Sequence, residues 1–288
     1  MMRSVLIIVM LGLLAACSGV RLGYNSADKV LAYRMDDWFD LDESLRPPAR
    51  ERLHRVLAWH RHEELPRYAQ VLRDAERRLA DPAPLRADEL LALQQQVTGR
   101  LLVLGDRVAD EFAEVFTRFG PAQRKRLLAR LKESNEDFRE DYLDASPGSV
   151  RKRRLEQFVD RYEFWLGRLD ADQRAHIDQW LARNGTDAAW RLALREERQR
   201  VFVGIVDEAS QGLPAPQTAA RLRAFFAELD SPAAAAVRQR HHEGNRARAQ
   251  LTADLFNMAT PAQRARAAER LRRLTEDFTV LSGQAAKS

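Results

Sequence analysis

The chain has 288 residues, of which 45% are hydrophobic and 31% charged, so it is long enough for one large or two smaller folded domains. The net charge is +5, but 42 of the 47 basic residues are arginine and acids nearly balance them, so we expect no nucleic-acid partner. The single cysteine excludes an internal disulfide framework.

The first predicted element is an export signal. Arg3 precedes the apolar stretch Val5–Leu14, which is shorter than the roughly 20 residues that a membrane span needs. The stretch ends in Leu-Ala-Ala followed by Cys17, with small residues at the expected cleavage site. We therefore predict a lipoprotein signal peptide over residues 1–16 and a lipidated tether over residues 17–26.

This ending resembles the lipobox of bacterial lipoproteins. The resemblance implies cleavage before Cys17, a diacylglycerol on its sulfur and an acyl chain such as palmitate on its new amino group. The next residue is Ser18, whereas known lipoproteins retained in the inner membrane carry Asp there. By this analogy we expect anchoring in the outer membrane, facing the periplasm. The covalent lipid is the only cofactor that we expect.

The rest of the chain is patterned as helices, and no stretch alternates apolar and polar residues as a half-buried strand would. The clearest helix covers residues 87–119, where apolar residues recur every 3.6 positions on average. We predict an all-α fold: an elongated multi-helix bundle of about ten helices in antiparallel hairpins. It should cover residues 27–283, with halves at 27–145 and 149–283, before a flexible tail at 284–288.

Helix starts are marked by repeated capping signals. Pro-Ala-Gln-Arg occurs at 121–124 and again at 261–264, which places Pro at the first helical position and Gln at the third. The segment 170–173 has Asp as its capping residue and Gln three positions later. The two Pro-Ala-Gln-Arg segments stay similar downstream, so we infer a weak internal repeat of helical hairpins. Pro66 should kink or split the helix predicted over 48–79.

Two segments carry ligand-capable side chains. His60 and Glu64 are four residues apart and could share a metal ion, although the same residues suit a solvated helix face ending at a proline kink. The acidic segment 36–43 lacks the glycine turn of a calcium loop. Its acids are therefore expected to end one helix and cap the next, while Trp38 and Leu41 enter the core.

A contact surface is predicted where the helix after Ser231 is crowded with basic residues. Arg238, His242 and Arg246 lie four residues apart in a stripe that could meet lipid phosphates or an acidic partner. A poorly buried, solvated helix would show the same pattern. We find no catalytic motif, neither a nucleophile elbow nor a phosphate-binding glycine loop nor zinc-ligand spacing, and we predict no catalytic residues.

Several segments together resemble an uncharacterised family of proteobacterial helical envelope lipoproteins, a domain of unknown function. The segments that carry the resemblance are 20–25, 59–68, 135–142 and 169–174. The match as a whole spans most of the mature chain and is looser past Trp190. The resemblance implies an all-α fold and an envelope location but no activity. A weaker similarity, at 169–173 and 259–263, is to periplasmic chaperones and metal sensors with Leu-Thr-x-x-Gln motifs.

From these features we expect a non-enzymatic, outer-membrane-anchored helical lipoprotein that acts through protein or envelope-surface contacts, as a chaperone-like or assembly accessory factor. Its partners would be the membrane, through the anchor, and a protein that the sequence does not identify. The alternative is a ligand- or metal-responsive envelope sensor that uses His60 and Glu64 or the acidic segment 36–43.

Overall fold

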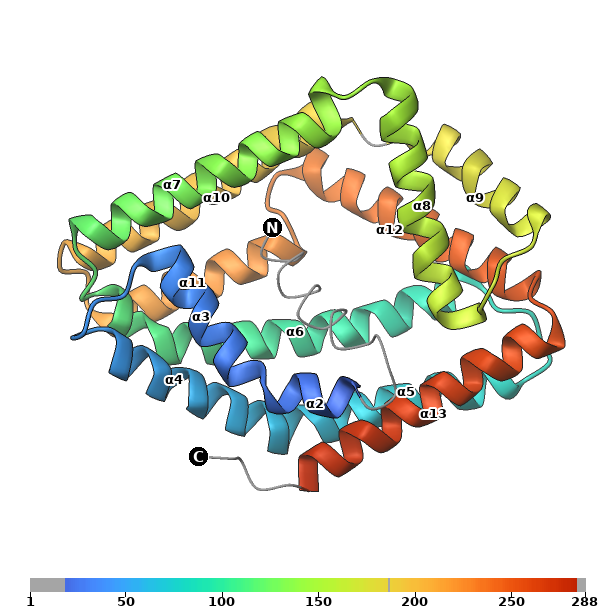
Figure 1. Ribbon diagram of the computed structural model, residues 1–288, viewed down its shortest axis with the longest axis horizontal. Helices are drawn as coiled ribbons and strands as arrows, with labels where there is room; N and C mark the ends of the chain where they lie inside the picture. Colours follow the sequence, from blue (N-terminus) through green and yellow to red (C-terminus); the bar gives the residue numbers. More distant parts are fainter. Residues whose placement is uncertain (1–18, 186, 284–288) are drawn as a thin grey trace.

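The computed structural model describes residues 19–185 and 187–283, and within these ranges it is helical and contains no strand, so the predicted all-α fold is confirmed (Figure 1). The α-helices are α2 (Gly19–Asn25), α3 (Ala27–Phe39), α4 (Arg46–Trp59), α5 (Leu65–Ala80), α6 (Ala87–Phe116), α7 (Pro121–Arg139), α8 (Pro147–Leu166), α9 (Ala171–Arg183), α10 (Ala188–Ser210), α11 (Ala215–Asp230), α12 (Ala235–Asn257) and α13 (Pro261–Gly283). Two π-helical turns, η1 (His60–Glu64) and η2 (Glu140–Asp144), join α4 to α5 and extend α7. None of the helices in these ranges combines the length and apolar character needed to span a bilayer.

Helix pairs form the sides of an open, four-cornered frame (Figure 1). The pair α7 and α10 lies along one side, and the pair α5 and α13 along another. The long helix α6, which matches the predicted 3.6-residue periodicity, packs against α4, α11 and α12. A turn at the junction of α7, η2, α8 and α10 forms the corner at the top of the figure.

The predicted capping signals start three of these helices. At α9, the Asp170 carboxylate accepts the Gln173 backbone N–H at 2.8 Å, and the Gln173 side chain accepts the Asp170 N–H at 3.1 Å. At α13, Thr260 and Gln263 make the same two hydrogen bonds at 3.2 and 3.0 Å. Gly120 begins α7 with its N–H bonded to a glutamine side chain at 3.0 Å. These hydrogen bonds satisfy backbone N–H groups at the start of each helix, which have no preceding helical turn to supply a carbonyl acceptor.

Pro66 does not break the helix, because a wider turn comes directly before it. The Leu65 N–H bonds to the carbonyl of His60, five residues earlier, which is the hydrogen bond of a π-helix. An α-helical turn would bring the proline ring against the carbonyl four residues earlier. The chain is therefore helical without a break from Arg46 to Ala80, and η1 lies at the position of the predicted kink, where the helix changes direction (Figure 1).

Two groups of four helices repeat one pattern of contacts. In unit A, which comprises α3, α4, α6 and α7, α3 packs against α4 and α7, and α4 packs against α6. In unit B, which comprises α8, α9, α12 and α13, α8 packs against α9 and α13, and α9 packs against α12. The order along the chain is the same, and each unit surrounds its own hydrophobic core. The weak repeat in the sequence thus corresponds to a repeat of four-helix units.

The same hydrogen bond closes both units. Gln123 of α7 donates its side-chain N–H to the carbonyl of Asp40, in the turn before α4, at 3.0 Å. Gln263 of α13 donates to the carbonyl of Arg168, in the turn before α9, also at 3.0 Å. Unit B adds a reciprocal pair, because the side-chain amides of Gln263 and the fully buried Gln173 each donate to the other at 3.0 Å.

The units exchange helices, so the chain does not divide at the break near Ser146. Helix α5 lies between α4 and α6 in sequence, yet its Leu79 belongs to the core of unit B. Helices α10 and α11 lie between α9 and α12, yet Val206 and Leu222 belong to the core of unit A. Residues 27–145 and 149–283 therefore complete each other's cores instead of forming independent halves.

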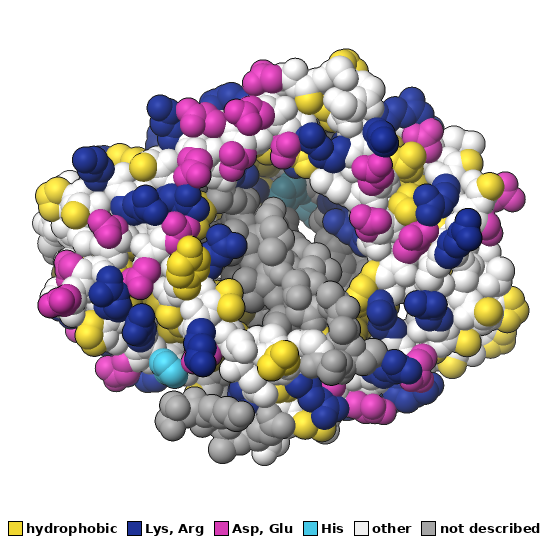
Figure 2. All heavy atoms as spheres, in the orientation of Figure 1, with side chains coloured by type: hydrophobic (Ala, Val, Ile, Leu, Met, Phe, Trp, Pro, Cys, Tyr) yellow, Lys and Arg dark blue, Asp and Glu magenta, His cyan; other side chains and the backbone are white. Residues whose placement is uncertain are grey.

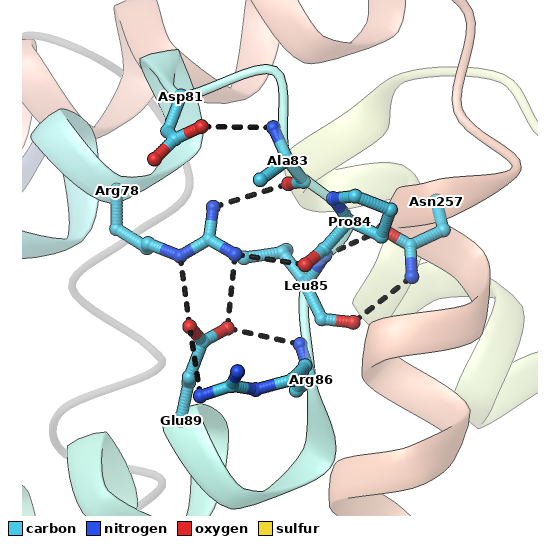
Figure 3. Close-up of polar contacts among 8 residues, drawn as sticks. All are labelled: Arg78, Asp81, Ala83, Pro84, Leu85, Arg86, Glu89 and Asn257. Carbon is cyan, nitrogen blue, oxygen red and sulfur yellow. Dashed lines mark hydrogen bonds and ion pairs between the residues drawn. The ribbon is translucent and has the colours of Figure 1, made fainter.

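The turn between α5 and α6 is fixed by two hydrogen-bond networks (Figure 3). Arg78 holds both carboxylate oxygens of Glu89, at 3.2 and 3.0 Å, and donates to the carbonyl of Pro84 at 2.8 Å. Asn257, at the end of α12, donates to the carbonyl of Leu85 at 3.0 Å and accepts its N–H at 2.8 Å. The second network ties this turn to unit B.

Candidate functional site

The predicted lipidation site, Cys17, lies outside the described residues, which begin at Gly19. Residues 19–25, inside the range predicted as a tether, form helix α2. Val20 and Tyr24 of this helix are buried, and Arg21 makes an ion pair with the buried Asp277 of α13. The described helical body therefore reaches to within two residues of Cys17.

His60 lies in η1 among aromatic rings. Its Nδ1 is 2.8 Å from the hydroxyl of Tyr24, and its ring centroid lies 5.9 Å from that of Tyr24 and 5.7 Å from that of Tyr68. Burial lowers the pKa of His60 to about 4, because the charged imidazolium loses its hydration there. At neutral pH the side chain is a neutral hydrogen-bonding group between α2 and η1.

Glu64 is fully buried and neutralised by arginines. Its Oε1 accepts hydrogen bonds from Arg67 at 2.8 Å and from Arg100 of α6 at 3.5 Å. No group of three or more His, Cys, Asp or Glu side chains with the geometry of a metal site occurs in the described part of the chain. The hydrogen bonds of His60 and Glu64 join η1 to α2 and to α6 respectively, so both residues have a structural role.

The predicted contact stripe on α12 is partly used within the fold. Arg238 is half-buried and donates to the carbonyls of Pro232 and Ala233, at 2.7 and 2.9 Å. Arg246 is exposed and pairs with Asp88 of α6 at 3.3 Å. His242 is exposed. The three residues do lie on one helix, but two of the three make contacts within the protein.

A second basic cluster, which the sequence analysis did not identify, lies at the corner where α7, η2, α8 and α10 meet. We name Phe138, Tyr142, Arg154, Arg191 and Arg195 the arginine corner. The two aromatic rings are 4.9 Å apart, and the Arg191 guanidinium lies 5.1 Å from each of them. Arg195 lies 5.7 Å from the Phe138 ring, so both guanidiniums are within cation–π distance.

The arginine corner brings three guanidiniums close together, two of which make no ion pair within the described residues. Burial lowers the pKa of Arg154 and of Arg195, and in each case repulsion from Arg191 adds to the effect. Within the described residues, the side chains of Arg154 and Arg191 make no hydrogen bond or ion pair, whereas the neighbouring Arg153 holds the Asp141 carboxylate at 2.6 Å. Half-buried guanidiniums over aromatic rings are suited to bind a carboxylate or phosphate.

The sequence carries local signals for this site, but on separate segments. Phe138 and Tyr142 are four residues apart, and a basic run at 151–154 comes after the turn. Arg191 and Arg195 come from α10, which reaches the corner only because it packs along α7 and η2. On the side facing α12, Arg240 stacks on Trp190 at 4.2 Å and extends the basic surface.

A search of curated proteins found no match to the chain, and a search of solved structures found none either. The model of a protein family described as a family of unknown function (DUF6279) matches residues 37–224. This range is more than half of the chain and contains η1, all of unit A from the end of α3 onward, and the whole arginine corner. The chain is therefore a member of the family of unknown function DUF6279.

Proposed function

We propose that this protein is a non-enzymatic helical lipoprotein, anchored in the outer membrane and facing the periplasm, that binds an acidic protein partner at the arginine corner. In this role it acts as a chaperone-like or assembly accessory factor. The observation that carries the proposal is that Arg154 and Arg191 lack ion pairs within the described residues in a protein whose arginines otherwise mostly pair with carboxylates.

An acidic partner suits this corner better than a neutral one. Crowded guanidiniums repel each other, and an approaching carboxylate relieves that repulsion while gaining bidentate hydrogen bonds. The aromatic rings beneath them provide the buried apolar contact that protein interfaces concentrate around arginine and tyrosine anchors. The Phe138 and Tyr142 rings, 4.9 Å apart, already hold the Arg191 guanidinium within cation–π distance of both.

The proposed location rests on the sequence before the described residues. The resemblance of the segment ending in Cys17 to a lipobox, and Ser18 after it, support an outer-membrane anchor in a proteobacterial envelope. The similarity to Leu-Thr-x-x-Gln proteins at 169–173 and 259–263 supports a neighbourhood of periplasmic chaperones. The capping boxes found there also serve the fold itself, so the arginine corner remains the main support for a partner.

The experiment is in-cell photo-crosslinking from position 142, followed by detergent extraction and mass spectrometry. The test variant is Arg154→Glu with Arg191→Glu. The control, Lys125→Glu with Lys132→Glu, makes the same change in net charge at exposed positions on α7. A partner should crosslink to the parent and to the control but not to the test variant. Cys17→Ala should also lose it, because the protein would leave its membrane.

Two outcomes would contradict the proposal. One is an unchanged crosslink in the doubly reversed variant, which would mean that charge at the corner does not select the partner. The other is an absence of any crosslink while a known envelope complex is captured in the same cells. A reversal of the partner's acidic residues to Lys that restores the crosslink to the test variant would identify the paired charges directly.

A further inference from the structure

We infer that the outward face of α2 and α3 lies on the surface of the lipid bilayer and fixes how the helical body is oriented on its membrane. The face consists of Leu22, Lys29, Val30, Tyr33 and Arg34, and we name it the bilayer face. The inference extends the proposed lipid anchor from a point of attachment to a second, side-chain contact with lipid.

The bilayer face holds the three most exposed large hydrophobic side chains in the described part of the chain. Leu22, Tyr33 and Val30 are 70%, 69% and 54% exposed, more than any other large hydrophobic side chain described. Val30 and Tyr33, three positions apart, fall on the same side of α3, and Leu22 lies on the adjoining α2. Figure 2 shows hydrophobic side chains over α2 and α3, facing the viewer, with Lys or Arg side chains between them.

The charges on this face match a phospholipid surface. Lys29 and Arg34 are exposed and make no ion pair within the described residues. The single acid between residues 19 and 34, Asp28, is partly buried. Long cationic side chains beside apolar ones place their charges at lipid phosphates while a tyrosine ring occupies the interface, as in interfacial amphipathic helices.

The short distance between the bilayer face and Cys17 favours lipid over a protein as what covers this face. Leu22 is five residues after Cys17, so even a fully extended chain keeps it within about 18 Å of an anchored lipid. The segment from Leu22 to Tyr33, which crosses from α2 to α3, adds at most about 17 Å of helix length. Val20 and Tyr24 hold the opposite side of α2 against the body, so the exposed side chains cannot turn inward.

The test is hydroxyl-radical footprinting of the full chain in its membrane, read by mass spectrometry. Oxidation of Tyr33 should be at least threefold slower in the membrane-bound protein than in the soluble Cys17→Ser protein. Met258, which is 39% exposed on the turn between α12 and α13, should oxidise equally in both. Equal oxidation of Tyr33 in the two forms, with lipid on Cys17 verified, would overturn the inference and leave the anchor intact.

A matched pair of variants separates lipid contact from general shielding. Leu22→Glu with Val30→Glu should return Tyr33 oxidation close to the soluble value, whereas Leu128→Glu with Val201→Glu, at exposed apolar positions elsewhere, should leave it slow. Protection that survives the first pair would point to a bound protein and contradict the inference.

The anchor and the bilayer face can fail separately. If mass spectrometry finds no lipid on Cys17 in cells, the anchor proposal is wrong. The single thiol of the full chain can then be coupled to a maleimide phospholipid in phosphatidylethanolamine–phosphatidylglycerol vesicles. The same footprint on those vesicles decides the inference, with slow Tyr33 oxidation supporting it and unchanged oxidation overturning it.

Discussion

The paired amides of Gln173 and Gln263 should be the most strongly coupled polar contact between α9 and α13. In Gln173→Ala, the protein loses the hydrogen bond to the Asp170 N–H and both amide–amide hydrogen bonds. Each is worth about 1 kcal/mol net, so we expect the free energy of unfolding to fall by about 3 kcal/mol. The side chain is fully buried, so no water replaces it.

Gln263→Ala should cost about 3–4 kcal/mol, because it also removes the hydrogen bond to the Arg168 carbonyl and leaves a buried amide unpaired. The two single changes remove the same two amide–amide hydrogen bonds. The double variant should therefore cost about 2 kcal/mol less than the sum of the singles. Urea unfolding, followed by circular dichroism and analysed with the same dependence of free energy on urea concentration for each variant, measures all three changes in the free energy of unfolding.

Two controls test the reasoning. Gln239→Ala removes an exposed hydrogen bond to Glu243 on the surface of α12 and should change the unfolding free energy by less than about 0.5 kcal/mol. Gln123→Ala in unit A should cost about 2 kcal/mol, since Gln123 makes two hydrogen bonds and has no amide partner. A coupling energy near zero between Gln173 and Gln263 would refute the reciprocal pair.

Three further changes have expected outcomes. Gly105→Ala should destabilise the protein, because the new Cβ would lie 3.1–3.3 Å from an aromatic side chain of α11. Gly99→Ala, which has open space around it on the same helix, should stabilise the protein by about 0.5–1 kcal/mol. Thermal unfolding compares the two variants. Burial keeps the pKa of His60 near 4 in the folded protein, below its unfolded value. The contribution of His60 to the free energy of unfolding should therefore be complete above about pH 6.5, and the free energy should fall by a few kcal/mol towards pH 4. His60→Asn should flatten this dependence, as measured by urea titrations at pH 7 and pH 5. Asn257→Ala should lose about 2 kcal/mol by removing both hydrogen bonds to the α5–α6 turn, with faster amide exchange at Leu85 as the local readout.

The helix starts could be predicted from sequence because capping is local. A Pro, an N-cap acceptor and a Gln three positions later lie within one turn, and their hydrogen bonds form wherever the helix goes. The acidic segment 36–43 obeys the same logic: Asp42 accepts the N–H groups of Ser44 and Leu45, while Leu41 is buried in the core of unit A. The capping boxes were therefore confirmed, whereas α4 begins without a side-chain cap, after a turn that Asp42 holds.

The π-turn shows what local reasoning leaves open. Pro66 correctly indicated that an α-helix could not continue unchanged, and the sequence analysis expected a kink or a break. Widening the preceding turn costs little when its side chains find partners, and here His60 bonds Tyr24 while Glu64 bonds Arg67 and Arg100. Those partners come from α2, α5 and α6. The π-turn at this position was therefore favoured by tertiary contacts that the segment itself does not encode.

The arginine corner could not be found from sequence for a related reason. Arg and acidic residues alternate along most helices and hide which guanidiniums remain unpaired, because pairing depends on which helices face each other. Arg151 and Arg153, in the same short run as Arg154, find Asp178 and Asp141 at 2.6 Å. Arg154 faces Arg191 instead, and the electrostatic repulsion between them arises only because the packing of α10 on α7 and η2 brings Arg191 near α8. Repulsion between arginines at this corner opposes folding stability, whereas most other arginines in the chain form ion pairs. This pattern is expected when binding, and not folding, selects the residues.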